Sequence, residues 1–277
     1  MSIPIIKSTG EEQSFSKKKL CASLEHAGAP KKLADTICKR VEDHINPGAS
    51  TSKIYREALR YLVKENRELA ARYSIRRGVA ALGPAGFVFE QYVETILQAY
   101  GFTTKRNVMM KGQCVTHEVD VMAMKDGVHY FLEMKYHNQV GIRTHINTVM
   151  YAYARLLDIS DGLAKKEKDT HEHKMWLITN TKFTDTSIKY ANCKDVILTG
   201  WDYPAGNSLE NMIEYKKLYP VTVLPSISGA MLEELAKKNI ILAQDLLPYT
   251  PHALSKLLMI DEYRAQKIAR DVAMLMK

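Results

Sequence analysis

The fold is decided by residues 117–135, which read HEVDVMAMKDGVHYFLEMK. Two strand-like runs flank the dipeptide Asp126-Gly127, and Asp-Gly between such runs is the strongest short-range signal for a β-hairpin. A two-residue turn at this dipeptide places Lys125 opposite Val128. We therefore expect two antiparallel strands whose register can be counted outward from the turn.

The predicted register brings acidic and basic side chains together. Counting outward sets Asp120 opposite Glu133 and Lys135 opposite Glu118. Side chains alternate along a strand, so Glu133 and Lys135 share one face, and that face also carries Asp120. Directly opposed residues have Cβ atoms about 4.5–5.5 Å apart, which lets two carboxylates bind one cation. A different turn length would shift this register.

The surroundings of the two carboxylates indicate a metal site. The residues expected on the opposite face are Val119, Val121, Leu132 and Met134. Close carboxylates among apolar neighbours repel each other and are costly to desolvate, and a cation such as Mg²⁺ (or Mn²⁺) relieves the repulsion. A lysine two residues on can orient or deprotonate metal-bound water and stabilise charge on phosphorus. The pattern predicts Asp120 and Glu133 as metal ligands and Lys135 as their catalytic partner, although this spacing also arises by chance.

Residues 83–180 resemble the catalytic domain of Mrr-like restriction endonucleases in the PD-(D/E)xK superfamily. The residues that carry the resemblance are Gly86, Phe87, Phe89, Glu90, Tyr100, Gly101, Phe102, Asp120, Glu133, Met134 and Lys135. The resemblance implies a mixed sheet between helices and metal-dependent hydrolysis of phosphodiester bonds. It also implies that Glu90 is an accessory acidic residue near the metal; a helix-surface glutamate is the alternative. Many Mrr-like members carry Gln where Glu133 stands, so this chain has the more standard acidic version.

The N-terminal part contains five segments that match a known family pattern: residues 6–10, 15–20, 27–29, 50–54 and 70–73. Through these segments, residues 3–82 resemble the ATP-cone, a regulatory nucleotide-binding domain of ribonucleotide reductases and some nucleic-acid proteins. The resemblance implies ATP or dATP as an effector, phosphate contacts from Lys7 and Lys19, and a supporting role for Thr51. The usual basic residue after Lys7 is Ser8 here, which weakens the phosphate prediction. Without the resemblance, residues 17–19 would be interpreted as a solvated helix face.

Residues 224–277 are expected to be all helical and are similar to the paired helix-hairpin-helix repeats of DNA repair proteins. Those repeats hold DNA phosphates with hairpin N–H groups. The hairpin glycines of that family are poorly kept, since only Gly229 is present and Asp261-Glu262 occupies the second hairpin. The alternatives are DNA contact and a small helical module for packing or dimerisation.

Local signals outline the remaining elements. We expect a short hairpin around the turn at residues 8–11, with Ser16 capping the first helix and Ser50 or Thr51 capping the third. Other helices are expected at 31–44, 65–82, 87–100 and 144–157, strands at 175–179 and 196–199, and an exposed polar loop at 164–173. The segment Gly83-Pro84-Ala85-Gly86 marks the first domain boundary.

Composition limits the class of protein. The net charge of +8 and pI near 9.1 suit a polyanionic partner such as DNA. No apolar run approaches the roughly 20 residues that cross a membrane, and the start lacks the features of a signal peptide, so we expect a cytoplasmic protein. Four scattered cysteines without a C-x-x-C pair predict reduced, mostly buried thiols.

These observations predict an α/β protein of three parts. They are an ATP-cone with a short hairpin and a helical bundle (1–82), a restriction-endonuclease-like α/β/α core with a mixed sheet (83–222) and a small all-helical domain (223–277). The expected function is that of an Mg²⁺-dependent DNA endonuclease regulated by ATP or dATP. The alternative is a non-catalytic, nucleotide-sensing DNA-binding regulator on a nuclease-like scaffold. Cutting both DNA strands generally calls for two active sites, which leaves a homo-oligomer open.

Overall fold

The computed structural model describes residues 3–7, 10–83, 86–138, 141–164, 171–224 and 226–276, except the side chains of 67 and 68. Several predicted features lie partly outside these ranges. They are the turn at Ser8-Thr9, the boundary at Pro84-Ala85, the polar loop at 165–170 and the proline at 225.

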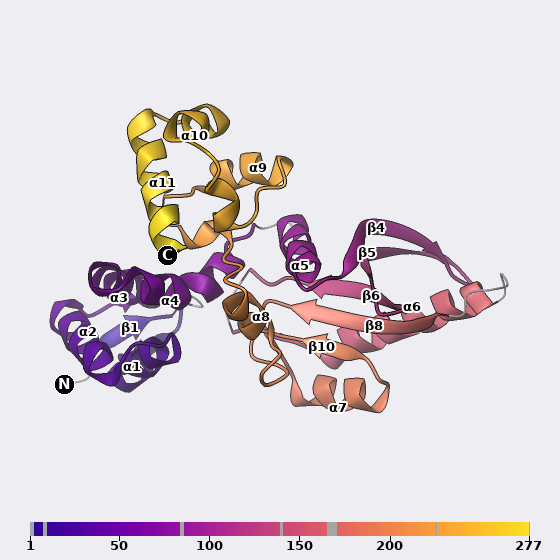
Figure 1. Ribbon diagram of the computed structural model, residues 1–277. Coiled ribbons are helices and arrows are strands. Elements are labelled where there is room, and N and C mark those ends of the chain that lie inside the picture. The colour runs from indigo at the N-terminus through magenta and orange to yellow at the C-terminus, as the bar shows by residue number, and fades with distance from the viewer. Residues whose placement is uncertain are drawn as a thin grey trace.

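An N-terminal unit combines a small sheet with four helices (Figure 1). Its strands are β1 (Pro4–Ile6), β2 (Glu12–Ser14) and β3 (Ala49–Ser50), and its helices are α1 (Lys17–His26), α2 (Lys31–His44), α3 (Thr51–Glu65) and α4 (Arg67–Ala80). Strand β1 pairs antiparallel with β2 and parallel with β3. The Ser16 side chain accepts a hydrogen bond from the third residue of α1, and the Ser50 side chain does the same in α3. Both predicted N-caps are confirmed.

A five-stranded mixed sheet forms the centre of the molecule. Its strands are β4 (Thr103–Lys111), β5 (Thr116–Lys125), β6 (Val128–Lys135), β8 (Glu172–Thr179) and β10 (Ile197–Thr199), in the order β10-β8-β6-β5-β4. Strands β4, β5 and β6 are antiparallel, whereas β6, β8 and β10 are parallel. Two short strands, β7 (Arg143–Thr144) and β9 (Lys182–Phe183), pair separately beside this sheet.

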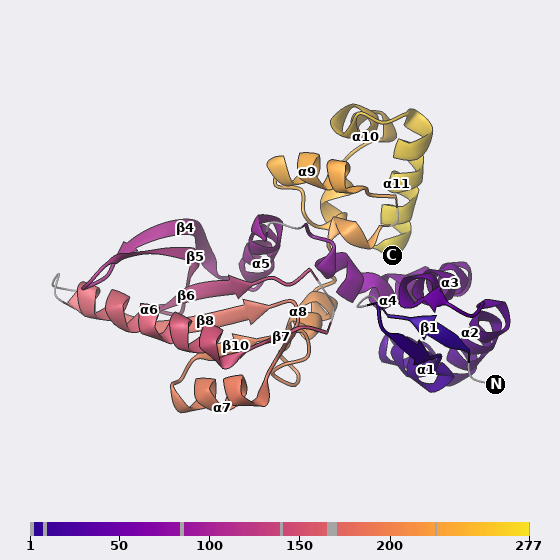
Figure 2. The ribbon, with the colours of Figure 1, turned by 180° about the vertical axis from the view of Figure 1, so that it is seen from behind.

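Helices cover both faces of the sheet (Figures 1 and 2). Helix α5 (Phe87–Ala99) packs on the face that carries Val121 and Leu132. Helices α6 (Ile146–Ala164) and α7 (Asp185–Cys193) pack on the other face, which carries Val119 and Phe131. The expectation of a mixed α/β fold is confirmed. Helix α6 continues seven residues beyond its predicted end at 157.

The C-terminal part is helical. Its elements are α8 (Leu209–Tyr215), the 3-10 helices η1 (Val221–Val223) and η2 (Ala243–Leu246), and α9 (Gly229–Lys237), α10 (Pro251–Leu258) and α11 (Glu262–Leu275). Leu235 and Ile268 from this part share one apolar core with Tyr92 of α5 and Ile75 of α4. The three predicted parts are therefore joined by packing, and their boundaries stay predictions.

The cysteines differ from expectation. Cys21 of α1 and Cys38 of α2 form a disulfide, with Cα atoms 5.8 Å apart, and Cys114 and Cys193 are exposed. The prediction of reduced, mostly buried thiols is therefore wrong in this structure. The antiparallel packing of α1 on α2 brings Cys21 and Cys38 together, and sequence spacing alone does not reveal that proximity. Within the described ranges, no helix is both long and apolar enough to cross a membrane.

Candidate active site

The β5–β6 hairpin has the predicted turn. Asp126 and Gly127 both adopt positive φ angles, 52° and 77°, as a two-residue type I′ turn requires. The ladder then runs from Lys125 opposite Val128 to Val121 opposite Leu132. This confirms the register near the turn, and the ladder ends one step before Asp120 and Glu133.

An irregularity at Asp120 ends the ladder. On the other side of β5, neither Asp120 nor Asn107 of β4 belongs to the β4–β5 ladder, and Asn107 has a φ of 52°. The Asp120 carboxylate instead accepts a hydrogen bond of 2.7 Å from the Met134 backbone N–H. Side-chain alternation is interrupted here, so Val119 packs toward α6 while Val121 packs toward α5. The expectation that all four apolar neighbours share one face is therefore wrong for Val119.

The second predicted pair, Lys135 with Glu118, is not part of the ladder. Glu118 pairs with Met109 of β4, and Lys135 lies exposed at the end of β6. The Lys135 backbone carbonyl accepts a hydrogen bond of 2.7 Å from the Thr179 hydroxyl of β8. Lys135 is thus anchored through its main chain, and its exposed side chain lies at the C-terminal end of the middle strand.

Glu133 lies in surroundings that disfavour its charge. Its side chain is 16% exposed. Burial and then the negative charge of Asp120 raise the pKa of Glu133 to about 7, although Arg155 and Lys135 act in the opposite direction. An effect of Asp120 on Glu133 requires the two carboxylates to be close. The structure therefore brings the two predicted metal ligands together.

Glu90 belongs to the same acidic cluster. It lies in the first turn of α5 and is half-buried. Burial raises its pKa, Asp120 and Glu118 raise it further, and Arg106 lowers it. Burial also raises the pKa of Asp120, and the hydrogen bond from Met134 opposes that rise. Glu90 is therefore positioned beside Asp120 rather than on an isolated helix surface.

Arg155 of α6 completes the site and was missed by sequence reasoning. Its Nη1 atom lies 2.5 Å from Glu133 Oε2 and donates to the Glu118 carbonyl oxygen at 3.0 Å. Its guanidinium lies 4.8 Å from the centre of the Tyr151 ring, and its side chain is 11% exposed. The available signal was one basic residue in a 19-residue, largely apolar helix. Such a residue is costly to bury without an anionic partner.

The carboxylates suit a hard divalent cation. Mg²⁺ takes oxygen ligands, often only one or two carboxylates, and keeps several waters. Asp120 and Glu133 supply such oxygens, and burial makes both more costly as uncompensated anions. Within the described ranges, no set of three or more His, Cys, Asp or Glu residues is arranged to hold a metal.

The predicted nucleotide residues are only partly together. Lys19 and Thr51 line a cavity of about 230 Å³ between the small sheet and α1, α3 and α4, together with Arg77. Lys7 is absent from this lining and forms an ion pair of 2.7 Å with Glu11. The structure thus places Lys19, one of the two predicted phosphate contacts, at the same cavity as Thr51, and Lys7 outside its lining.

The C-terminal hairpins have mixed features. Helix α9 begins at Gly229, and Ser228 is its N-cap. In the second hairpin, Met259 ends α10 in the left-handed conformation, and α11 follows. Met259 is 86% exposed, as a residue at the tip of a helical hairpin can be. Contact of either hairpin with DNA stays a prediction.

Comparisons with known proteins relate most of the chain to one group. The family described as "AF1548-like, C-terminal" matches residues 219–276. An uncharacterized protein of Archaeoglobus fulgidus is 40% identical over 152 residues, which are 55% of this chain and 82% of that protein. The crystal structure of AF1548, a protein of unknown function, matches with a TM-score of 0.56 and 34% identity, covering 66% of this chain and 94% of the other.

A more distant likeness is to Can2 from Sulfobacillus thermosulfidooxidans, solved in complex with cyclic tetra-adenylate. The TM-score is 0.34 and the identity 13%, over 74% of this chain and 64% of the other. At that level of similarity we draw nothing from it.

Proposed function

The chain belongs to the AF1548-like family, and we propose that it is a metal-dependent DNA endonuclease of the PD-(D/E)xK type, regulated by nucleotide. The observation that carries the proposal is the cluster of Glu90, Asp120 and Glu133 at the point where the β5–β6 ladder ends. The negative charge of Asp120 raises the pKa of both Glu90 and Glu133, and partly buried carboxylates under such repulsion are costly for stability alone. Such an arrangement is typical of a site that binds a cation for chemistry.

Each residue of the cluster has a proposed role. Asp120 and Glu133 would hold Mg²⁺ or Mn²⁺, and Glu90 would support that metal shell from α5. The metal would supply a polarised phosphoryl oxygen and an acidified water. The Asp120 carboxylate is oriented by the Met134 N–H, so its second oxygen is available for a cation. The metal would then lie between β5 and the C-terminal end of β6.

Lys135 would provide a positive charge beside the two metal ligands. Its backbone is fixed by Thr179, whereas its side chain is exposed at the edge of the sheet. From there its ammonium group would orient the attacking water and stabilise negative charge on the phosphate. Arg155 would keep the Glu133 carboxylate oriented from the α6 side of the sheet, through their ion pair of 2.5 Å.

The other two parts would supply regulation and DNA contact. The N-terminal unit would act as an ATP-cone, with ATP or dATP held as an effector by Lys19 near Thr51. The C-terminal helices would contact DNA phosphates in the manner of helix-hairpin-helix repeats. The net charge of +8 supports a polyanionic substrate.

Cleavage of supercoiled and linear DNA tests the proposal. The assay uses Mg²⁺ or Mn²⁺, with and without ATP and dATP. Wild-type protein is expected to nick or cut, and Asp120→Asn is expected to abolish cutting while keeping an acceptor for the Met134 N–H. Asp161→Ala, an exposed substitution on α6, is the matched control and should cut normally. Equal cutting by wild type and Asp120→Asn would refute the assigned active site.

One observation favours a second candidate, a non-catalytic, nucleotide-sensing DNA-binding regulator. The Arg155 guanidinium already neutralises Glu133, as a structural ion pair would. For this function, DNA would bind without being cut under any metal condition, and Asp120→Asn would leave binding unchanged. Metal-dependent cutting that is lost in Asp120→Asn would exclude it.

A further inference from the structure

A large cavity lies between the N-terminal unit and the central sheet. Its volume is about 700 Å³, within the range of roughly 300–1,000 Å³ typical of small-molecule sites. One wall comes from α1, α3 and α4. The other comes from the loop after β6, from β9 and from the segment leading into α8. Asp120 and Glu133 do not line it, so it is separate from the candidate active site.

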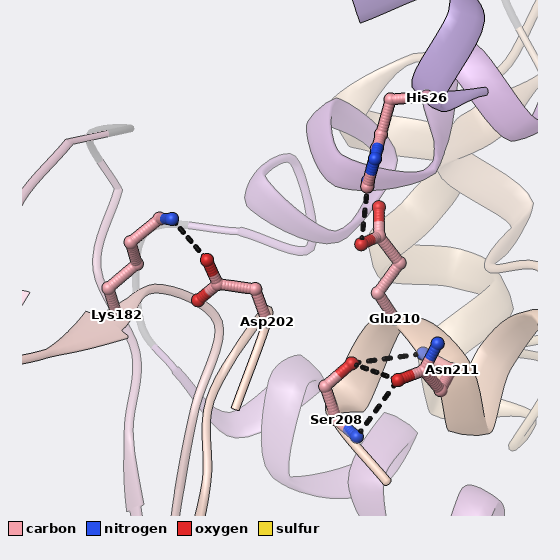
Figure 3. Close-up of polar contacts among 6 residues, drawn as sticks. All are labelled: His26, Lys182, Asp202, Ser208, Glu210 and Asn211. Carbon is pink, nitrogen blue, oxygen red and sulfur yellow. Dashed lines mark hydrogen bonds and ion pairs between the residues drawn. The ribbon is translucent and has the colours of Figure 1, made fainter. Parts of the chain in front are cut away.

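Two carboxylates of this joint cavity are paired (Figure 3). Lys182 of β9 forms an ion pair with Asp202. His26 of α1 faces Glu210 of α8, with Nε2 and Oε2 3.1 Å apart. A third carboxylate, Glu214, is half-buried; burial and Glu210 raise its pKa, and the charge of Arg72 lowers it. The cavity is also lined by three arginines of α4, Arg72, Arg76 and Arg77.

Two arginines of α4 face aromatic rings instead of carboxylates. The Arg77 guanidinium lies 3.7 Å from the centre of the Tyr55 ring, and that of Arg76 lies 5.8 Å from the centre of the Trp201 ring. Both arginines are half-buried, and within the described part of the chain no carboxylate forms an ion pair with either. A guanidinium stacked on a ring keeps its planar N–H fork available, which suits bidentate binding of phosphate.

The same wall carries aromatic rings. The ring of Tyr55 contacts Arg77 and also stacks on that of Tyr73, with centroids 5.0 Å apart and an angle of 16° between planes. Trp201 lines the opposite wall and is 3% exposed. Aromatic side chains bind nucleic-acid bases by stacking and tolerate any base identity. Phosphate anchors beside aromatic rings, in a cavity of this size, match a nucleoside phosphate.

We propose that the joint cavity binds a nucleoside phosphate, with Arg76 and Arg77 holding its phosphates and the rings near them holding its base. This site is distinct from the smaller cavity beside Lys19, although Thr51, Tyr55, Tyr73 and Arg77 border both. The proposal does not depend on nuclease activity.

The location connects this ligand to the candidate active site. Asn138, which lines the cavity, lies three residues after Lys135. The Asn180 side chain accepts from the His137 N–H and donates to its carbonyl oxygen, both at 2.8 Å. A ligand at this wall therefore lies beside the loop that continues from the end of β6 and that Asn180 holds at His137.

Binding of ATP to the full chain tests the proposal by calorimetry and by tryptophan fluorescence. ATP is expected to change the fluorescence of the wild type, and Trp201→Phe is expected to abolish that change. Arg76→Gln is expected to weaken this binding event at least about tenfold, since hydrogen bonds to charged groups are lost. Lys19→Gln should leave the Trp201 signal in place.

Controls separate specific binding from general electrostatics and from misfolding. Arg60→Gln removes an exposed arginine that pairs with Glu57 on α3 and should bind ATP as the wild type does. Arg76→Lys keeps the charge but not the planar guanidinium, so it should weaken ATP binding several-fold. If Arg76→Gln does not fold, the affinity of Arg76→Lys tests the role of Arg76 in its place. A urea unfolding curve checks the fold of each variant.

Several outcomes would overturn the proposal. They are an absence of ATP binding, equal affinity in Arg76→Gln and Arg60→Gln, and a fluorescence change that persists in Trp201→Phe. A response of Trp201 to a 12-nucleotide single-stranded DNA but not to ATP would also overturn it, in favour of a nucleic-acid site. Because DNA cleavage is measured separately, the nuclease proposal can fail while this one holds, and the reverse.

Discussion

Replacement of Glu133 by Gln should stabilise the metal-free protein above neutral pH. Burial and Asp120 raise the pKa of Glu133 from 4.5 to about 7. Between these pH values the folded state holds the proton more tightly than the unfolded chain. The stabilisation from the protonated carboxyl is therefore complete below about pH 4.5 and is lost as the pH rises to about 7. At roughly 1.4 kcal/mol for each pKa unit, the loss approaches about 3 kcal/mol.

Gln resembles the protonated carboxyl in shape and charge, so the variant should escape this loss. Urea unfolding of the metal-free proteins at pH 5, 6, 7 and 8 measures the difference. We expect similar free energies of unfolding near pH 5 and an advantage for Glu133→Gln of up to about 3 kcal/mol at pH 8. Glu12→Gln, an exposed substitution on β2, should follow the wild-type curve.

The opposite result would refute this reasoning. If Glu133→Gln is less stable than the wild type at pH 8, the ion pair with Arg155 outweighs burial, and the ionised carboxylate is stabilising. Mg²⁺ provides a second measurement: it should raise the unfolding midpoint of the wild type at pH 8 and raise that of Glu133→Gln less, because a ligand stabilises the state that binds it.

Three further substitutions test other parts of the structure. Lys19→Gln should weaken ATP binding about tenfold or more in calorimetry, whereas Lys7→Gln should change it little, because only Lys19 lines the N-terminal cavity. Gly162→Ala should lower the free energy of unfolding by about 1–3 kcal/mol, since its Cβ would lie 2.5 Å from the Gly112 backbone; an unchanged urea midpoint would contradict this contact. Tyr92→Phe should cost about 1–3 kcal/mol by leaving a buried carbonyl oxygen without its donor, and a neutral effect would show that water or repacking replaces that donor.

The hairpin shows how far local sequence determines a site. Asp126-Gly127 specifies the turn, and the turn specifies the pairing from Lys125–Val128 outward, because each step depends only on neighbouring residues. The same counting gave no indication that pairing stops before Asp120. The stop depends on the left-handed conformation of Asn107 in β4 and on the hydrogen bond from Met134, and both arise from the third strand and the packed sheet.

Two residues show what a sequence pattern does not predict: Arg155 was not expected at the site, and Lys7 was expected at the nucleotide cavity but does not line it. Arg155 lies 22 residues from Glu133 on another element, so only the packing of α6 under the sheet brings the two charges to 2.5 Å. Lys7 matches a family pattern, yet its local contact is with Glu11 and not with the cavity. A pattern identifies residue types, but the partner of a long, flexible side chain is selected by what packs around it.

By itself the sequence determined the helices with their Ser16 and Ser50 caps, the hairpin turn and the acidic motif, because these depend on interactions within a few residues along the chain. Only the tertiary structure decided what the charged groups meet: Arg155 meets Glu133 on the α6 side of the sheet, and Arg76 of α4 meets the Trp201 ring at the joint cavity. Those contacts join elements far apart in sequence. Their geometry follows from how apolar faces pack together, which no local pattern specifies.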